Sequence, residues 1–281
     1  MKEKGEHIEL SDADIEMLAD ELEEMGVEIN DDNCVNKNTI SLKQLSGLQI
    51  KYFWANEWYP LLANKGLTMH SILIPLSNDQ IDKIIQGKDC PEFNPYLQQL
   101  NNNVFVRLGT VSPKDADLKL KVTNSQEMVN LLSRSDRVVR KMLDQKKQKQ
   151  QQYLFLRQYD ERIITSTEFR VFVTHRECVA ISQDDLTINS ELIKDVEKTK
   201  KDIINFCSEV MKHLWYDDCT LDVCYLEEDG VWQLVEINTP YYLLAGTALF
   251  DVDQDSDLLE GKYFHEYGTE IRMNLPLYYD S

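Results

Sequence analysis

The sequence LDVCYLEEDGVWQLVEIN spans residues 221–238 and has the pattern of a β-hairpin. Leu221–Tyr225 and Trp232–Ile237 alternate apolar residues with others and are rich in β-branched and aromatic side chains. The segment Glu227–Gly230 lies between them, and a short acidic segment ending in glycine is typical of a hairpin turn. We therefore expect two antiparallel strands here.

Three side chains of this hairpin carry oxygen atoms suited to a metal. Glu236 and Asn238 are two residues apart, so they project from the same face of their strand. A turn centred on Glu228–Asp229 pairs Asp222 with residue 235, 236 or 237, and only the middle register places all three side chains on one face. Two carboxylates and an amide oxygen there would form a site for a hard cation such as Mg²⁺. The alternative is an edge hairpin with ordinary solvated acids.

The charge of the chain restricts its partners. Hydrophobic residues make up 42% of the 281 residues and charged residues 28%, which is typical of a soluble globular protein. The net charge is −19, and residues 1–33, with thirteen acids and two lysines, contribute −11 of it. This acidity argues against nucleic-acid binding, which needs a basic surface. We expect this acidic arm, residues 1–33, to keep the protein soluble. The alternative is that it binds a basic protein partner.

The cysteines and the apolar runs indicate the compartment. Six cysteines occupy positions 34, 90, 178, 207, 219 and 224 without forming a CxxC pair. No apolar leader follows the first residues, and the longest apolar run, Tyr241–Phe250, is too short to span a bilayer. We expect reduced thiols, a cytoplasmic location and no membrane association.

Apolar periodicity predicts strands and helices in irregular alternation. Besides the hairpin, we expect strands over Thr68–Leu76, Val104–Leu108, Tyr153–Tyr159, Glu168–Val173 and Cys178–Gln183. We expect helices over Ser11–Gly26, Pro95–Asn102, Ser125–Leu143 and Ser190–Trp215, whereas Asn78–Asn94 is polar and rich in turn residues. With antiparallel hairpins on the C-terminal side, this order predicts an α+β or a mixed α/β fold.

Arg107, Arg157 and Arg170 each lie inside a predicted strand. An arginine among apolar neighbours needs an anionic partner because its charge cannot be removed, and that partner is either a structural carboxylate or a ligand phosphate. Guanidinium groups for phosphate and hard oxygens for Mg²⁺ are the minimum needed to bind a nucleoside triphosphate.

Several other kinds of site are excluded by missing motifs. The chain has no GxxxxGK[ST] loop and no GxGxxG, so a P-loop, a dinucleotide loop and a protein-kinase loop are absent. It also has no HExxH, and His70, His175 and His265 are isolated from one another. The kind of site that remains is one in which basic side chains on strands and a metal hold phosphate.

The chain resembles the cell division cycle protein 123 family, eukaryotic ATP-grasp proteins, from about Trp58 to Phe250. Any one matching block is weak, but all of them occur in the family's order with comparable gaps. The blocks are WYP, SILIPL, VFVRLGTVSPKDA, YLFLRQY, EFRVFV, AISQ, LDVCY and LVEIN.

This resemblance implies an α+β, ATP-grasp-like fold of two lobes with antiparallel sheets and a nucleotide cleft between the lobes. The resemblance implies an ATP-grasp-like domain over 39–281, with lobes 39–152 and 153–281, and the acidic residues and apolar spacing before it predict an acidic helical appendage over residues 1–38. The resemblance further implies ATP and Mg²⁺ as cofactors. The nucleotide residues it implies are Arg107, Ser112, Arg157, Gln158, Tyr159, Arg170 and Gln183, and the metal ligands are Asp222, Glu236 and Asn238.

Some positions differ from the family pattern. Arg107 replaces the family's phosphate-binding lysine, and Glu236 replaces an aspartate. Asp184 stands where the family usually has arginine, which removes one positive charge from the implied site.

The resemblance implies an assembly chaperone for eukaryotic translation initiation factor 2 that binds the factor's γ subunit. The alternative is an ATP-grasp ligase or protein-modifying enzyme that activates a carboxylate as an acyl phosphate, because the same nucleotide residues would serve that chemistry. No side chain is an obvious acid–base catalyst. A third hypothesis is a scaffold of this fold that binds proteins without nucleotide.

Overall fold

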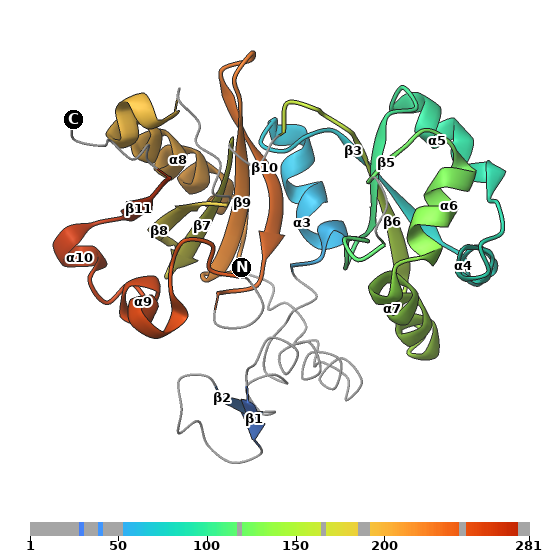
Figure 1. The fold of residues 1–281 in the computed structure, drawn as a ribbon, viewed down its shortest axis with the longest axis horizontal. Coiled ribbons are helices and arrows are strands. Elements are labelled where there is room, and N and C mark those ends of the chain that lie inside the picture. The colour runs from blue at the N-terminus through green and yellow to red at the C-terminus, as the bar shows by residue number, and fades with distance from the viewer. Residues whose placement is uncertain are drawn as a thin grey trace, which may run out of the picture. The chain divides into compact units, whose positions relative to one another are not determined.

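The computed structural model describes residues 28–30, 39–41, 53–116, 120–163, 167–184, 192–241 and 246–274 (Figure 1). The chain divides into two compact units: unit 1 comprises residues 1–53, 165–223 and 236–281, and unit 2 comprises residues 54–164 and 224–235. A short parallel pair, β1 (Glu28–Asn30) and β2 (Thr39–Ser41), is also present. The predicted helix over Ser11–Gly26 lies outside the described residues.

Unit 2 contains a four-stranded sheet with the order β3-β6-β4-β5. The pairs β3–β6, β6–β4 and β4–β5 are all antiparallel. The strands are β3 (Ser71–Leu76), β4 (Val104–Leu108), β5 (Lys121–Val122) and β6 (Gln152–Gln158). The helices are α3 (Ala55–Leu62), α4 (Asn78–Ile85), α5 (Asn94–Gln99), α6 (Ser125–Ser133) and α7 (Asp136–Lys147), with short 3₁₀ turns at Ala63–Lys65 and Pro91–Phe93.

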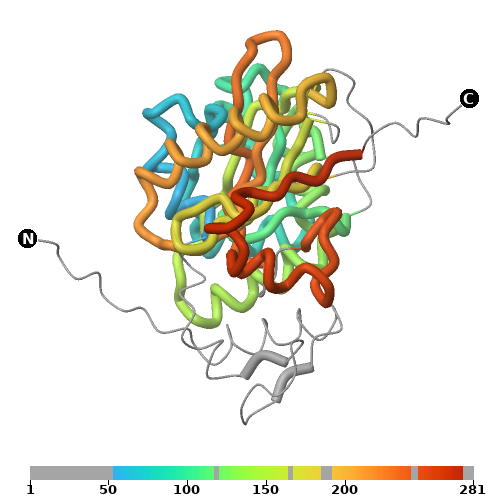
Figure 2. The backbone as a smooth tube through the Cα atoms, turned by 90° about the vertical axis from the view of Figure 1, so that its left-hand side faces the viewer, coloured from blue at the N-terminus to red at the C-terminus, as the bar shows by residue number. Residues whose placement is uncertain are grey.

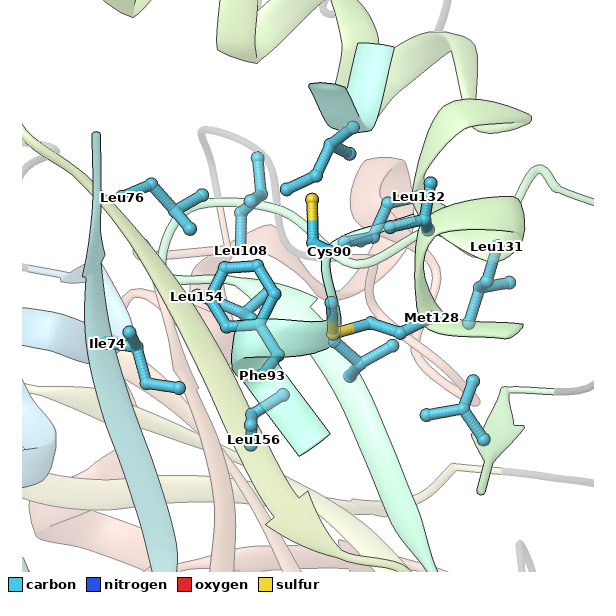
Figure 3. Packing of buried hydrophobic residues seen from close by; sticks show 14 of the residues in the cluster. Ile74, Leu76, Cys90, Phe93, Leu108, Met128, Leu131, Leu132, Leu154 and Leu156 are labelled. Carbon is cyan, nitrogen blue, oxygen red and sulfur yellow. The ribbon is translucent and has the colours of Figure 1, made fainter. Parts of the chain in front are cut away.

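Strand alternation gives this sheet one face for the core. Val106 pairs with Leu156 and Leu108 with Leu154, so these four apolar side chains share a face. Figure 3 shows strand residues such as Leu154 meeting Phe93 and the α6 side chains Met128, Leu131 and Leu132. The opposite face of β4 and β6 is left for other contacts.

The segment that the sequence marks as rich in turns contains the helix α4. Gln80 N donates to Ser77 Oγ at 3.2 Å, and Ser77 N donates to Gln80 Oε1 at 2.9 Å, which together form a capping box. Ile81 and Ile84 then turn one face of the helix into the core. The prediction of turns at this place was wrong, since two buried residues suffice for so short a helix.

The single helix expected over Ser125–Leu143 is two helices, α6 and α7. Ser135 has an extended backbone (φ −87°, ψ 111°) and begins α7 by accepting a hydrogen bond from Val138 N at 3.2 Å. Its hydroxyl also donates to the carboxylate of Asp115, which accepts from Arg137 N at 3.1 Å. Apolar spacing continues across the break, so periodicity alone did not reveal it.

Unit 1 is built on a five-stranded sheet with the order β10-β9-β7-β8-β11. Strands β7 and β8 are antiparallel, and β11 joins β8 in parallel. The strands are β7 (Glu168–Thr174), β8 (Glu177–Gln183), β9 (Cys219–Leu226), β10 (Val231–Asn238) and β11 (Glu270–Arg272). The helices are α8 (Val196–Met211), preceded by a 3₁₀ turn at Leu192–Asp195, α9 (Val252–Leu259) and α10 (Phe264–Tyr267).

The hairpin expected over residues 221–238 is confirmed as β9 and β10. Leu226 O accepts from Asp229 N at 3.1 Å and from Gly230 N at 2.8 Å, and Gly230 has φ +66°, the left-handed conformation that glycine adopts without strain. Residues 224–235 of this hairpin belong to unit 2, while its two open ends belong to unit 1.

The predicted lobes 39–152 and 153–281 divide the chain differently from the two compact units. Strand β6, which follows the predicted boundary, pairs with β3 and β4 on its two sides. It therefore lies within unit 2, because both of its hydrogen-bonding edges are occupied by earlier strands.

The C-terminal end of α8 is held by an arginine from the β7–β8 turn. His175 and Arg176 form this turn with φ of +52° and +66°. The Arg176 guanidinium donates to the carbonyl oxygens of Met211, Leu214 (3.3 Å) and Tyr216 (3.1 Å). A cation at this position satisfies carbonyl groups that a helix end leaves open.

In the described ranges, every helix is too short or too polar to cross a bilayer.

Replacement of Ser135 by alanine tests the break between α6 and α7. Ser135→Ala should lower the free energy of unfolding by about 1–2 kcal/mol, because the helix cap is lost and Asp115 loses a donor. The measurement is urea unfolding followed by circular dichroism. Ser133→Ala is the matched control, since Ser133 Oγ makes only a long bond to Asn130 O (3.4 Å), and its effect should stay within about 0.5 kcal/mol. Equal effects of the two substitutions would contradict the assignment.

Candidate functional site

In unit 2, the two predicted phosphate-binding arginines lie on one face of the sheet. Arg107 on β4 pairs with Phe155 on β6, and Arg157 on β6 pairs with Phe105 on β4. Cross-strand partners project to the same face, so both arginines lie on the face opposite to the one that Leu154 and Leu156 turn to the core. Both are buried, with exposed fractions of 8% for Arg107 and 5% for Arg157.

Arg157 is held by oxygens from two other parts of unit 2. Its Nε donates to Ser71 Oγ at 3.2 Å and its Nη1 to Val235 O at 2.8 Å. The guanidinium carbon lies 5.1 Å from the centre of the Phe155 ring, within cation–π range. Ser71 is itself fixed by Tyr59, whose hydroxyl donates to Ser71 O (2.8 Å) and accepts from Ser71 N (2.7 Å). The orientation of this arginine is therefore set by the protein.

Arg107 and Ser112 lie at the two ends of one strand-to-loop transition. Arg107 Nε donates to Leu108 O at 3.0 Å. Ser112 follows in the loop after β4 and is buried, and its hydroxyl has no hydrogen-bond partner among the described residues. A buried hydroxyl in this state is expensive to keep, which makes Ser112 a good candidate for contact with a ligand.

Gln158 and Tyr159, which follow Arg157 in the sequence, differ in their positions on the sheet. Gln158 pairs with Val104, which belongs to the core face, and its side chain is exposed at the end of β6. Tyr159 N donates to Asn103 O at 2.7 Å, and Lys121 Nζ lies 5.4 Å from the centre of its ring. Gln158 thus lies on the face opposite the arginines, whereas Tyr159 follows the end of β6 and its ring lies beside Lys121, which pairs with Phe105 on the arginine face.

In unit 1, the predicted site is centred on an ion pair between Arg170 on β7 and Asp222 on β9. Arg170 Nε and Nη2 donate to the two oxygens of Asp222 at 2.8 and 3.0 Å, the two-pronged geometry that arginine forms with carboxylates. Arg170 Nη1 donates to Gly246 O at 2.8 Å. Both side chains are largely buried, with exposed fractions of 16% and 17%.

Asn238 and Glu236 extend this cluster. Asn238 Nδ2 donates to Asp222 Oδ2 at 2.8 Å, so the two open ends of the hairpin are joined by their side chains. Asp184 Oδ1 is 4.0 Å from Arg170 Nη2, and Glu236 is close enough to affect the titration of both members of the ion pair. Three carboxylates therefore surround one guanidinium.

The titration behaviour follows from this crowding. Burial raises the pKa of Asp222, and Arg170 opposes this shift. The negative charges of Glu236 and Asp184 raise the pKa of Asp222 further. Burial by itself lowers the pKa of Arg170, but Asp222, Asp184 and Glu236 together hold it above its ordinary value. The cluster carries more negative than positive charge, and a divalent cation would offset the excess.

The donor set of this cluster fits Mg²⁺. Asp222, Glu236 and Asn238 supply hard oxygen ligands, which Mg²⁺ prefers. Within the described ranges, no three or more His, Cys, Asp or Glu side chains are grouped so that they could hold a metal ion. The set Asp222, Glu236 and Asn238 has only two such residues, because its third member is an amide. Arg170 occupies both oxygens of Asp222, so a metal would compete with the guanidinium for this carboxylate.

Gln183 lies apart from Arg170. Ser182 pairs with Arg170 and shares its face, whereas Gln183 pairs with Phe169 on the other face. Gln183 is fully buried, and its Oε1 accepts from Asn274 N at 3.1 Å. Two groups that the sequence did not indicate, Ser71 Oγ and Gly246 O, contact the arginines instead. Ser71 opens the block SILIPL, but a backbone carbonyl such as that of Gly246 leaves no signal in sequence.

Comparison with known proteins identifies the family. The family model described as D123 matches residues 91–273. A putative CDC123-like protein of Acanthamoeba polyphaga mimivirus is 28% identical over 283 residues, covering 87% of each chain. A translation initiation factor eIF2 assembly protein of Dictyostelium discoideum is 27% identical over 154 residues, which cover 50% of this chain and 40% of that protein. The chain thus spans less than half of that relative.

The fold agrees with this result. The structure of Cdc123 from Schizosaccharomyces pombe matches with a TM-score of 0.68 and 20% identity, covering 81% of this chain and 97% of that one. The chain belongs to the D123 family, that of the Cdc123 proteins. The predicted family resemblance and the predicted α+β fold class are both confirmed.

The ion pair of unit 1 can be tested without any ligand. Arg170→Ala should lower the free energy of unfolding by about 3–5 kcal/mol, because it leaves the buried Asp222 carboxylate without its cation. Arg170→Ala/Asp222→Asn should recover part of this loss, because the double variant no longer buries an unpaired charge. Both are measured by urea unfolding.

Arg272→Ala is the control for that experiment. Arg272 also forks a carboxylate, Asp255 (2.6 and 2.7 Å), but its side chain is 33% exposed. Its loss should be smaller than that of Arg170→Ala, since the Arg272 side chain is about twice as exposed as that of Arg170 (16%) and solvent screens its charge more. A double variant no more stable than Arg170→Ala would show that Asp222 is not an unpaired charge in the single variant.

Proposed function

We propose that this protein is an ATP- and Mg²⁺-binding assembly chaperone for eukaryotic translation initiation factor 2. The nucleotide part is carried by the cluster in unit 1, where Asp222, Glu236 and Asp184 outnumber the single cation Arg170. The client part is supported by family membership and by relatives that are named as assembly proteins of eIF2.

Each unit contributes its own chemistry to the proposal. Arg107 and Arg157 in unit 2 bind phosphate oxygens through charge-assisted hydrogen bonds, with Ser112 as a further donor. Asp222, Glu236 and Asn238 in unit 1 hold Mg²⁺, which when bound neutralises phosphate charge. Arg170 positions Asp222 and keeps the carboxylate from being an unpaired charge when the metal is absent.

Gln158, Tyr159 and Gln183 have a weaker place in this proposal. Gln158 and Gln183 lie on sheet faces opposite the arginines of their own units, so they act on nucleotide only through backbone groups or neighbours. Tyr159 offers an aromatic ring beside Lys121, which suits contact with a base.

Titration with ATP and Mg²⁺ tests the metal ligands. The wild-type protein should bind ATP more tightly with Mg²⁺ than with EDTA, and Asp222→Ala should abolish that difference because a carboxylate ligand is removed. Isothermal titration calorimetry measures both. Glu228→Ala is the matched control, because Glu228 lies in the turn of the same hairpin with a 79% exposed side chain and should leave the difference unchanged. Equal behaviour of the two variants would rule out the metal assignment.

The phosphate contact is tested by Arg157→Ala. Loss of a charge-assisted hydrogen bond of about 1.5–3 kcal/mol corresponds to ATP binding weakened roughly 10- to 150-fold. Arg140→Ala, an exposed arginine of α7, should leave affinity unchanged. Since Arg157 also binds Ser71 and Val235, unfolding curves must show that the variant is folded at the assay temperature. A folded Arg157→Ala protein with wild-type affinity would remove Arg157 from the nucleotide site.

Client binding is a separate experiment. The protein should retain the purified γ subunit of translation initiation factor 2 in a pull-down, and the retained amount should respond to ATP with Mg²⁺. Asp222→Ala should lose the response to nucleotide. If no γ subunit is retained with or without ATP, the client assignment fails, whereas the ATP titration still decides the nucleotide assignment.

A further inference from the structure

Unit 1 contains a cavity that lies outside the predicted nucleotide residues. Its volume is about 360 Å³, and it is lined by Val179, Leu258, Tyr263, Phe264, Tyr267, Gly268 and Glu270. We refer to these seven residues as the α10 pocket. Figure 2 shows the red stretch of chain that folds from α9 through α10 into β11 and supplies six of them.

The pocket has an apolar floor fixed by close packing. Val179 on β8 is 3% exposed, and a Cβ added to Gly261 would lie 2.9 Å from its Cγ1. Gly261 also has φ +73°, so glycine is needed there for both reasons. Thr269 Oγ1 donates to Cys178 O at 2.6 Å, and Thr174 Oγ1 donates to Leu259 O at 3.1 Å. These contacts attach the α9–β11 stretch to the sheet, so the pocket is preformed.

Its walls are aromatic and open to solvent. Tyr267 is 74% exposed and Tyr263 47% exposed, with ring centres 6.5 Å apart and ring planes at 61°. Phe264 adds a third ring to the lining. A single exposed aromatic residue is ordinary, but angled rings around a hollow are the arrangement that binds cations through their ring faces.

The charge around the pocket is strongly negative. Glu270 is the one charged residue in the lining, and its Oε1 lies 3.8 Å from Arg272 Nε. Residues 251–272 contain seven acids (Asp251, Asp253, Asp255, Asp257, Glu260, Glu266 and Glu270), one lysine and one arginine, a net charge of −5 with histidine neutral, and the arginine, Arg272, is paired with Asp255. The lysine, Lys262, is already paired with Asp257 at 2.7 Å and Glu260 at 2.8 Å. The surroundings therefore attract cations.

We propose that the α10 pocket binds an arginine side chain presented by a peptide segment of a partner protein. A guanidinium is planar, stacks on aromatic rings and forms two parallel hydrogen bonds with a carboxylate. Tyr263 and Tyr267 supply the ring faces, Glu270 supplies the carboxylate, and Val179 and Leu258 take the methylene groups of the side chain. This interaction goes beyond the proposed nucleotide function and requires neither ATP nor metal.

Peptide titration tests this pocket. The probe is the acetylated and amidated pentapeptide Gly-Leu-Arg-Leu-Gly, and its partner carries citrulline, which has nearly the same shape without the charge. The arginine peptide should bind about 3- to 30-fold more tightly than the citrulline peptide, as expected for a cation–π contact. NMR chemical-shift perturbation measures both affinities. Equal affinity, or no binding of the arginine peptide, would overturn the proposal.

Variants locate the binding. Tyr267→Ala and Glu270→Gln should each weaken the arginine peptide by about 3- to 30-fold and bring it close to the citrulline peptide. Tyr96→Ala is the matched control, since Tyr96 is a partly exposed tyrosine of α5 in unit 2, and it should change nothing. Wild-type affinity in both pocket variants would place the peptide elsewhere. The affinity for the arginine peptide should be the same with and without ATP and Mg²⁺, so failure here is distinguishable from failure of the nucleotide proposal.

Discussion

Guanidinium groups buried in β-sheets impose the main constraint on this protein. Arginine cannot lose its proton, so each buried arginine must meet oxygen atoms that the fold supplies. In unit 1 Arg170 meets both oxygens of Asp222, and in unit 2 Arg157 meets Ser71 Oγ and Val235 O. These oxygens come from different strands and segments, so each arginine also ties parts of its own unit together.

Arg157 and Arg170 differ in the charge of the oxygen atoms around them. Arg157 donates hydrogen bonds to two neutral oxygens, Ser71 Oγ and Val235 O. Arg170 is surrounded by Asp222, Glu236 and Asp184, so its cluster is negative and suits a cation. Asp184 increases this negative charge.

Local sequence patterns predicted the strands, the hairpin and the charged residues well. Alternation identified β4, β6, β7 and β8, and the acidic turn ending in Gly230 identified β9 and β10. Asn238 Nδ2 contacts Asp222 Oδ2, whereas the predicted convergence of Asp222, Glu236 and Asn238 on a metal stays a prediction. These features depend on period, turn chemistry and the cost of burying charge, all of which are local.

Features that depend on distant residues were not predicted. The split at Ser135 depends on Asp115, which is 20 residues earlier, and the facing of Gln183 depends on its register with Phe169. The family pattern groups Gln158 and Gln183 with the arginines, although strand alternation places their side chains on the opposite faces. The α10 pocket likewise required β8, α9 and β11 to meet, which no spacing of residues 251–270 could indicate.

The path of the hairpin through both units affects the order in which the chain can fold during synthesis. Thr68 Oγ1 donates to Leu234 O across 166 residues, and Arg157 reaches Val235 O across 78. Unit 2 therefore lacks two of its contacts until the ribosome has passed residue 235, although its sheet strands end at residue 158. Unit 1 also needs both ends of the hairpin. Unit 2 can therefore be completed once residue 235 has left the ribosome, whereas unit 1 also needs residues 236–281 and is completed later.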